Sequence, residues 1–296
     1  MKQTFKTYRA VAAMLAAILL LSVGLTALNG GFSVGSTQDK VVLATTYPVY
    51  LAAQNIIGGN TPIRLTRLDG AASGCLHDYQ LSPSDRRAVQ EAEIILMNGA
   101  GAETFLHGIV EEAKCVDTSA GVDLLCADHD HGHAEGDHHH EEYNEHLWLS
   151  PTRYAQQVTA VRDALCALDP VCADTYRANA AAYLAEITAI ADSLPDLGGR
   201  PCVLFHDSMS YLAADLGLDV KLTLSVEGES GLSAAHLGQV EALAAQYPDL
   251  LLLYDTQYAL RYEGVAGTPV TIHTAVQEDW LTAMQANVKE LKKVVG

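Results

Sequence analysis

The sequence predicts an α/β protein with two lobes, each built on a parallel-rich central sheet flanked by helices. Two observations predict this fold class. Short apolar runs alternate with longer segments of helical periodicity, as in parallel sheets wrapped by helices. The alternation is interrupted by one long helical stretch at 170–194 and then begins again. The simplest arrangement is two α/β lobes joined by this single long helix.

Each expected element follows from its local pattern. In the first half, we expect strands at 41–45, 63–68, 93–97 and 115–116, and helices at 49–57, 83–91 and 102–113. In the second half, we expect strands at 203–205, 220–224, 250–253 and 270–272, and helices at 208–216, 233–247 and 279–295. The pairs Ser82-Pro83, Ser150-Pro151 and Asp169-Pro170 each place a capping side chain before a proline, which indicates a helix start.

The chain divides into four expected segments. Residues 1–35 are a signal peptide or an N-terminal membrane anchor. They are followed by an N-terminal α/β lobe, a linking helix and a C-terminal α/β lobe, at 36–169, 170–196 and 197–296.

The charge balance excludes some classes of partner. The chain has 36 Asp and Glu residues against 18 Lys and Arg residues, for a net charge of −18. Phosphate backbones and anionic lipid headgroups would repel it, so we expect no nucleic-acid partner. At 49% hydrophobic and 18% charged residues, it is also too apolar to be disordered throughout.

The N-terminus predicts export to the periplasm or the cell surface. Lys2, Lys6 and Arg9 precede an uncharged, mostly aliphatic run at 10–28, which is typical of a signal peptide. The run also has the length of a membrane-spanning helix, so cleavage and retention as an anchor both remain open.

Export permits disulfide bonds between the six cysteines. Cys166 and Cys172 flank the Asp169-Pro170 turn and are placed to meet across a helix corner. The other four leave three pairings open, with free thiols as the alternative: Cys75, Cys115, Cys126 and Cys202.

A low-complexity loop at 128–146 contains seven His and seven acidic residues but no Lys or Arg. It has too little apolar content to order itself. We expect it to capture metal weakly and exchangeably. A purely solubilising loop is the alternative.

Four histidines are placed for a common site. His206 and His273 each directly follow an expected strand of the second lobe, while His77 and His146 precede helix starts of the first. Ligands of open α/β sheets bind beyond the carboxyl ends of the strands. Imidazoles gathered there, without a nucleophile motif, favour a transition metal over acyl transfer.

Several motifs carry a resemblance that runs from about Val41 to the C-terminus. The sequence resembles the zinc/manganese ABC-transporter solute-binding proteins (ZnuA/TroA-like, cluster A-I). The resemblance rests on Thr45-Thr46-Tyr47-Pro48, Gly74-Cys75-Leu76-His77-Asp78-Tyr79, Pro83-Ser84-Asp85, Asn98-Gly99, His146-Leu147-Trp148-Leu149-Ser150-Pro151, Leu168-Asp169-Pro170 and Phe205-His206-Asp207.

The resemblance implies two lobes bridged by a rigid helix, with a metal ion in the cleft between them. It places metal ligands at His77, His146 and His206, with His273 or a water molecule as the fourth. It further implies a non-enzymatic protein that delivers its ion to an ABC permease. The sequence does not indicate an oligomeric state, and we expect a monomer by default. Asp207 and Glu145 are candidates for orienting the imidazoles, and Asp255 lines the cleft without binding metal.

The ligand set favours Zn²⁺, because neutral imidazole suits zinc while Mn²⁺ prefers carboxylate oxygens. His273 stands where manganese-type members have Asp. Cys75 before the H-D-Y motif and the lack of a lipid-anchored Cys also depart from the family pattern. His107 and His236 fall in helical patterns and are expected on the surface.

Three other functions stay open. A manganese-specific homologue is one alternative. Three His with an open fourth position also occur in zinc hydrolases, for which Asp207 would be the general base. A surface adhesin is the third.

Overall fold

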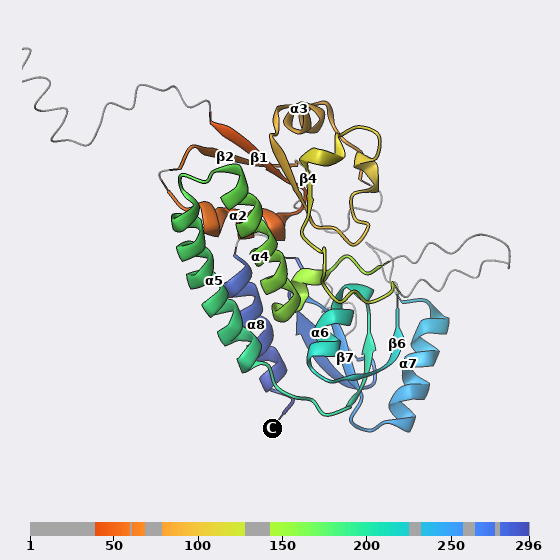
Figure 1. The fold of residues 1–296 in the computed structure, drawn as a ribbon. Coiled ribbons are helices and arrows are strands. Elements are labelled where there is room, and N and C mark those ends of the chain that lie inside the picture. The colour runs from red at the N-terminus through yellow and green to blue at the C-terminus, as the bar shows by residue number, and fades with distance from the viewer. Residues whose placement is uncertain are drawn as a thin grey trace, which may run out of the picture. The chain divides into compact units, whose positions relative to one another are not determined.

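The computed structural model describes residues 39–59, 61–68, 79–127, 143–224, 232–256, 264–275 and 279–295. These residues belong to one compact unit, Asp39–Gly296. Within it, two α/β lobes are connected by helices (Figure 1).

The N-terminal lobe is built on four parallel strands in the order β2-β1-β3-β4. Helices pack on this sheet, and two short 3₁₀ turns follow β3. The elements are β1 (Lys40–Ala44), α2 (Tyr47–Ile57), β2 (Ile63–Arg67), α3 (Pro83–Glu91), β3 (Ile94–Met97), η2 (Thr104–Leu106), η3 (Glu112–Lys114) and β4 (Cys115–Asp117).

The C-terminal lobe repeats this arrangement with strand order β6-β5-β7-β8, again all parallel. The predicted α/β fold with two sheets is thus confirmed. The elements are β5 (Pro201–Leu204), η5 (Asp207–Met209), α6 (Ser210–Asp215), β6 (Asp219–Thr223), α7 (Ala234–Gln246), β7 (Leu251–Asp255), β8 (Thr268–Ile272) and α8 (Trp280–Lys292).

Both sheets change winding direction at the same place in their strand order. In the N-terminal sheet this switch point lies between β1 and β3, whose carboxyl ends lead into Thr45 and Asn98. In the C-terminal sheet it lies between β5 and β7. His206 lies two residues past the end of β5, and Asp255 is the last residue of β7. Open α/β sheets bind ligands at such switch points, so the fold favours a ligand site beside these four residues.

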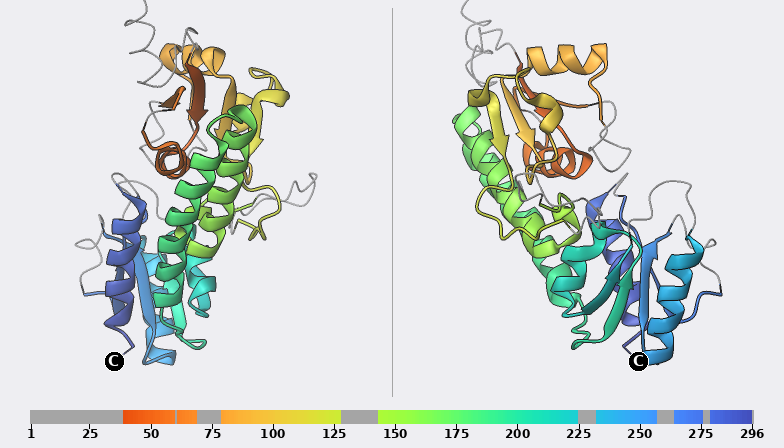
Figure 2. Two further views of the ribbon diagram at one scale, coloured as in Figure 1. Left: turned by 60° about the vertical axis from the view of Figure 1, so that its left-hand side comes forward. Right: turned by 90° about the vertical axis from the view of Figure 1, so that its right-hand side faces the viewer.

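Two antiparallel helices connect the lobes. A 3₁₀ turn, η4 (Leu147–Leu149), leads into α4 (Pro151–Leu168), and α5 (Ala173–Ser193) runs back beside it (Figure 2). The Ser150 side chain accepts a hydrogen bond from the Arg153 backbone N–H, and Pro151 occupies the first turn, as the sequence predicts. Helix α5 packs against α2 and α4 and also against α8 of the C-terminal lobe.

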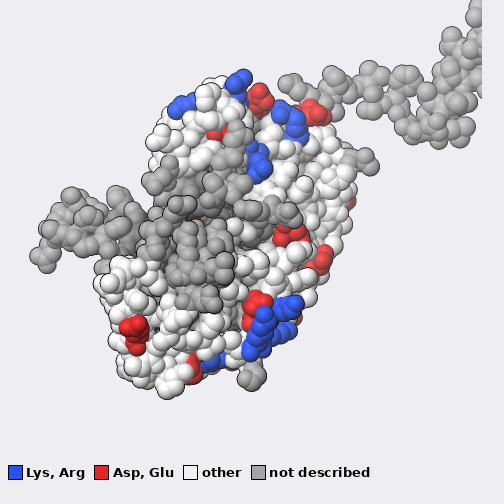
Figure 3. Space-filling model, turned by 180° about the vertical axis from the view of Figure 1, so that it is seen from behind, with Lys and Arg blue, Asp and Glu red and all other residues white. Residues whose placement is uncertain are grey.

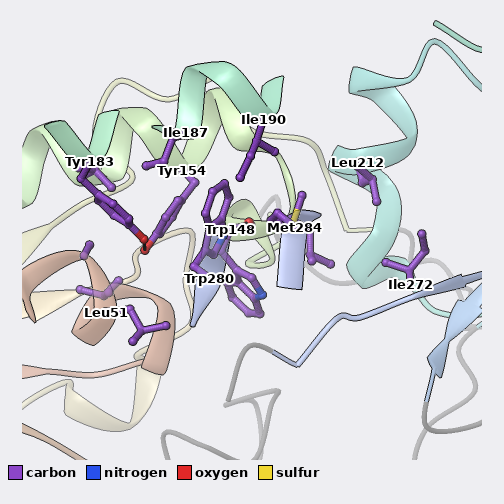
Figure 4. Packing of buried hydrophobic residues seen from close by; sticks show 14 of the residues in the cluster. Leu51, Trp148, Tyr154, Tyr183, Ile187, Ile190, Leu212, Ile272, Trp280 and Met284 are labelled. Atoms are coloured by element: carbon purple, nitrogen blue, oxygen red, sulfur yellow. Dashed lines mark hydrogen bonds between the residues drawn. The ribbon is translucent and has the colours of Figure 1, made fainter. Parts of the chain in front are cut away.

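One apolar core extends through both lobes. Trp280 on α8 stacks on Tyr154 of α4, with ring centroids 4.4 Å apart, and donates its indole N–H to the Trp148 carbonyl at 2.8 Å. Figure 4 shows the same cluster reaching Leu51 on α2 at one end and Leu212 on α6 at the other. The lobes are therefore joined by shared packing as well as by chain connections.

The prediction of a helix at 102–113 is wrong. The chain instead forms η2 and η3, separated by a turn in which Gly108 has a φ of 73°. This left-handed conformation interrupts an α-helix, and glycine adopts it without a Cβ penalty.

The cysteines that the structure describes are all free thiols, so the Cys166–Cys172 disulfide is not formed. The Cys166 Sγ instead donates to the Ala173 carbonyl at 3.5 Å. Cys75 lies outside the described residues.

The apolar N-terminal run at 10–28 also lies outside the described residues. Among those that are described, no helix has both the length and the apolar character needed to cross a membrane.

Charged side chains are scattered on the face seen in Figure 3, where Lys and Arg occur in small groups beside Asp and Glu. Lys293, one residue past the end of α8, pairs with Glu290 at 2.6 Å. Exposed pairs of this kind contribute little stability, so the shared core carries the fold.

Replacing Trp280 with Ala tests the shared core. We expect the free energy of unfolding to fall by about 3–5 kcal/mol, the usual effect of truncating a buried Trp. Because the core is common, both lobes should still unfold in one transition when urea denaturation is followed by circular dichroism and by Trp148 fluorescence. Two separate transitions would contradict a shared core. Val171→Ala serves as the control, because the Val171 side chain is exposed (92%) and lies outside the core.

Candidate metal centre

The structure places His146 and His206 side by side, one from each lobe. His146 lies just before η4, and His206 lies two residues past the end of β5, at the switch point of the C-terminal sheet. Their ring centroids are 5.6 Å apart, with the ring planes at 89°. Potential ligand atoms of His146, His206 and Asp207 all lie within 4.8 Å of one another. A single metal ion could be held there after small side-chain movements.

The neighbours of His146 determine which ring nitrogen faces a metal. The Asn144 Oδ1 accepts the His146 backbone N–H at 2.9 Å and lies 3.1 Å from the His146 Nδ1. Since this oxygen can only accept, Nδ1 carries the proton, and in the neutral imidazole Nε2 then has the lone pair. A neutral imidazole in this tautomer is a zinc ligand.

His206 has two competing partners at its Nδ1. The Ser208 backbone N–H donates to this nitrogen at 3.0 Å, while the Asp207 Oδ1 lies 3.1 Å from it. An unprotonated Nδ1 satisfies Ser208, and a protonated one satisfies Asp207. In the second state Nε2 is free to bind a metal, as in the carboxylate–histidine pairs of zinc sites.

His273 lies at the carboxyl end of β8, and its side chain is half-buried. The Asn287 side chain holds its backbone, accepting from its N–H at 2.8 Å and donating to its carbonyl at 3.2 Å. The next residue, Thr274, accepts the indole N–H of Trp148 at 3.2 Å, so this segment lies beside the one that carries His146. The His273 ring is not part of the group formed by His146, His206 and Asp207.

His77 lies outside the described residues. The segment that follows it is held by Tyr79, whose hydroxyl donates to the Asp85 Oδ2 at 2.6 Å and whose ring packs edge-on against Phe105. Asp85 also completes the capping box with Ser82 at the start of α3. The tyrosine of the H-D-Y motif thus anchors its chain to a well-formed helix end.

The structure also describes the other residues that the sequence singled out. Asp255 is 8% exposed and accepts the Thr274 hydroxyl. Glu145 is buried, and its carbonyl accepts the Asn98 side-chain amide at 2.9 Å. His107 is exposed and His236 is half-buried on α7.

A buried carboxyl group organises the N-terminal side of the site. The Glu103 Oε1 accepts the Thr45 hydroxyl at 2.6 Å and the Asn98 backbone N–H at 2.7 Å, and its Oε2 accepts the Gly99 N–H at 3.1 Å. Asn98 in turn holds the Glu145 carbonyl, one residue before His146. This network ties the segment that carries His146 to the switch point of the N-terminal sheet.

Burial raises the pKa of Glu103 from its usual 4.5 to about 7, because the ionised form is poorly solvated and Glu145 adds negative charge nearby. The hydrogen bonds from Thr45, Asn98 and Gly99 oppose this shift. Glu103 therefore exchanges its proton near neutral pH.

Three residues near the site were not predicted from the sequence: Asn144, Glu103 and Tyr211, whose hydroxyl donates to the Asn144 carbonyl at 2.8 Å. An available signal for Asn144 is its spacing, since Asn side chains often accept the backbone N–H two residues on. Glu103 closely follows the Asn98-Gly99 motif, and this proximity is a signal that it belongs to the same site. Tyr211 lies in an unremarkable helical pattern, and only its three-dimensional contacts reveal it.

Comparison with known proteins identifies the family of this chain. Residues 42–294 match the model of the family described as "Zinc-uptake complex component A periplasmic" (ZnuA). The chain belongs to the ZnuA family. The resemblance predicted from the sequence motifs is thereby confirmed.

Curated relatives of this ZnuA-family chain are named as zinc proteins. The zinc-binding lipoprotein AdcA of Streptococcus pneumoniae is 26% identical in an alignment 281 residues long that covers 85% of this chain and 55% of AdcA. The chain therefore spans about half the length of that relative. The high-affinity zinc uptake system protein ZnuA of Yersinia pestis is 28% identical over 272 residues, 83% of this chain and 81% of that protein.

Solved structures share the fold. A crystal structure of ZnuA superposes with a TM-score of 0.67 at 24% identity, covering 87% of this chain and all of the other. The Zn(II)-bound ZnuA-like domain of S. pneumoniae AdcA gives 0.69 at 22% identity, with 86% and 98% coverage. The Mn²⁺ complex of FpvC from Pseudomonas aeruginosa gives 0.69 at 20% identity, with 87% and 98% coverage. The same two-lobe fold thus occurs with either metal.

The raised pKa of Glu103 predicts a pH-dependent stability that Glu103→Gln removes. The folded protein binds this proton more tightly than the unfolded chain. The stabilisation is therefore complete below about pH 4.5, is lost as the pH rises to about 7, and then stays constant. The shift corresponds to about 3 kcal/mol.

Urea denaturation of the metal-free protein between pH 4.5 and 8 measures this effect. The difference in unfolding free energy between wild type and Glu103→Gln should change over this interval. The exposed Glu93→Gln is the matched control. Parallel stability curves for wild type and Glu103→Gln would show that Glu103 ionises normally.

Proposed function

We propose that this chain captures Zn²⁺ outside the cytoplasm in a site between its lobes and delivers it to the permease of an ABC importer. The observation that carries the proposal is the pairing of His146 with His206, one from each lobe, at a ring distance of 5.6 Å. The ligands we propose are His77, His146 and His206, with His273 or a water molecule completing a tetrahedral site.

The chemistry of the donors supports zinc over manganese. His146 presents an unprotonated Nε2, and His206 does so when Asp207 accepts its Nδ1 proton. Neutral imidazole nitrogens suit Zn²⁺, whereas Mn²⁺ favours oxygen ligands. The family's description as a zinc-uptake component and the zinc-binding relatives support the same choice.

The shared core supports a transport role in which the lobes do not swing apart. Zinc release then requires docking to the permease and a small shift of the ligands in the C-terminal lobe. The named relatives are zinc-binding and zinc-uptake proteins, which favours transport over the zinc hydrolase. We further propose that the chain is exported and monomeric. If residues 1–35 are not cleaved, they attach it to the membrane.

Replacing the proposed ligands one at a time tests this function. We expect His146→Ala and His206→Ala each to weaken Zn²⁺ binding at least about 100-fold, because loss of a ligand exceeds the roughly 10–100-fold effect of its outer partners. His77→Ala should behave alike, and the effect of His273→Ala distinguishes a fourth imidazole from a water ligand.

Competitive chelator titrations with Zn²⁺ and Mn²⁺ measure these affinities, and His107→Ala, on the exposed surface, is the control. The zinc proposal fails if Mn²⁺ competes equally with Zn²⁺ in the wild-type protein. The site is misplaced if His146→Ala and His206→Ala bind zinc as tightly as His107→Ala.

A further inference from the structure

Asn144 is a buried residue that uses all of its polar groups in hydrogen bonds. Its side chain and backbone are together 2% exposed. The Oδ1 accepts from both the backbone N–H and the Nδ1 of His146, and the Nδ2 donates to the Asp207 carbonyl at 2.8 Å. Its backbone N–H donates to the Leu125 carbonyl at 2.9 Å, and its own carbonyl accepts the Tyr211 hydroxyl at 2.8 Å.

These contacts join the two ligand-bearing segments through one side-chain amide. The oxygen end fixes the tautomer of His146 in the N-terminal lobe. The nitrogen end holds the turn of His206 and Asp207 in the C-terminal lobe. An amide is suited to this position because it offers an acceptor and a donor about 2 Å apart.

Tyr211 determines where Asn144 lies. Its side chain is fully buried on α6, in the small apolar cluster that also contains Leu147 and Val122. Its hydroxyl accepts the Leu125 N–H at 3.1 Å and donates to the Asn144 carbonyl. One hydroxyl of the C-terminal lobe therefore holds two chain segments of the N-terminal lobe.

The ring of Tyr211 is itself held from the N-terminal lobe. The Arg153 guanidinium lies 4.7 Å from its centroid, and Arg153 pairs with Asp215 at the end of α6 at 3.0 Å. Both charged side chains are only 13% exposed. Asp215 also accepts the Ser150 hydroxyl at 2.6 Å, so the start of α4 and the end of α6 form one polar junction.

We propose that Asn144 is a positioning residue that sets His146 and the His206–Asp207 turn at the spacing zinc requires, with the Tyr211 hydroxyl holding Asn144 in place. This inference rests on the proposed zinc site. Residues that orient metal-bound histidines typically change metal affinity about 10–100-fold when they are replaced. Because one amide serves both lobes, displacing it changes both ligands together.

Three substitutions separate the parts of this role. Asn144→Ala removes the contacts to both ligand segments. Asn144→Asp keeps an acceptor for His146 but sets a carboxylate oxygen against the Asp207 carbonyl, so it breaks only the contact with the His206–Asp207 turn. Tyr211→Phe keeps the ring and removes the hydroxyl. Tyr176→Phe is the matched control, because Tyr176 is also fully buried and its hydroxyl donates to Asp169 at 2.9 Å, away from the site.

We expect Asn144→Ala and Tyr211→Phe each to weaken Zn²⁺ binding about tenfold or more, while Tyr176→Phe leaves it unchanged. The affinities come from chelator competition, together with thermal unfolding of the metal-free variants. Nitrogen NMR of the metal-free protein should show the Nδ1–H tautomer of His146 preserved in Asn144→Asp and mixed with the Nε2–H tautomer in Asn144→Ala.

The inference is overturned if Asn144→Ala and Tyr211→Phe bind zinc like wild type. It is also overturned if Tyr176→Phe loses as much affinity as Tyr211→Phe, since the effect would then be general destabilisation. If Asn144→Ala does not fold, Tyr211→Phe and Asn144→Asp decide the question. Failure of the wild-type protein to bind zinc would instead refute the proposed function.

Discussion

Trp280 stacks on Tyr154 and donates its indole N–H to the Trp148 carbonyl, and through these contacts the last helix of the C-terminal lobe enters the core of the N-terminal lobe. The surrounding cluster is continuous from α2 to α6 and β8. Wide opening of the lobes would expose this apolar surface and leave buried polar groups without partners, and both changes are costly. The relative position of the lobes is therefore fixed by packing.

In a fixed frame, the proposed metal binding depends on short segments. His146 and His206 lie on loops at the ends of rigid elements, and the Nδ1 of each imidazole already has hydrogen-bonding partners. The two alternatives at the His206 Nδ1, Ser208 or Asp207, differ by a proton position and a small rotation. Capture and release of a metal can be accomplished at this scale, without movement of α4, α5 or α8.

Much of this architecture was predictable because it is encoded locally. Ser150-Pro151 and Ser82-Pro83 mark helix starts, and alternating apolar runs mark the strands. His206 follows from its place after β5. The helix expected at 102–113 failed because Gly108 takes a left-handed conformation that periodicity does not reveal. Asn144 and Tyr211 could not be paired from the sequence, since their contact spans 67 positions and depends on how the lobes pack.

Hydrogen–deuterium exchange with and without Zn²⁺ tests the central claim that metal binding is local within a fixed two-lobe frame. The account predicts that zinc slows exchange at 143–150 and 205–211, the segments that carry His146, Asn144, His206 and Tyr211. Exchange along α4, α5 and α8 should stay the same. A zinc-dependent change in protection along α5 and α8 would contradict the account, because it would show that the shared core rearranges when the metal binds.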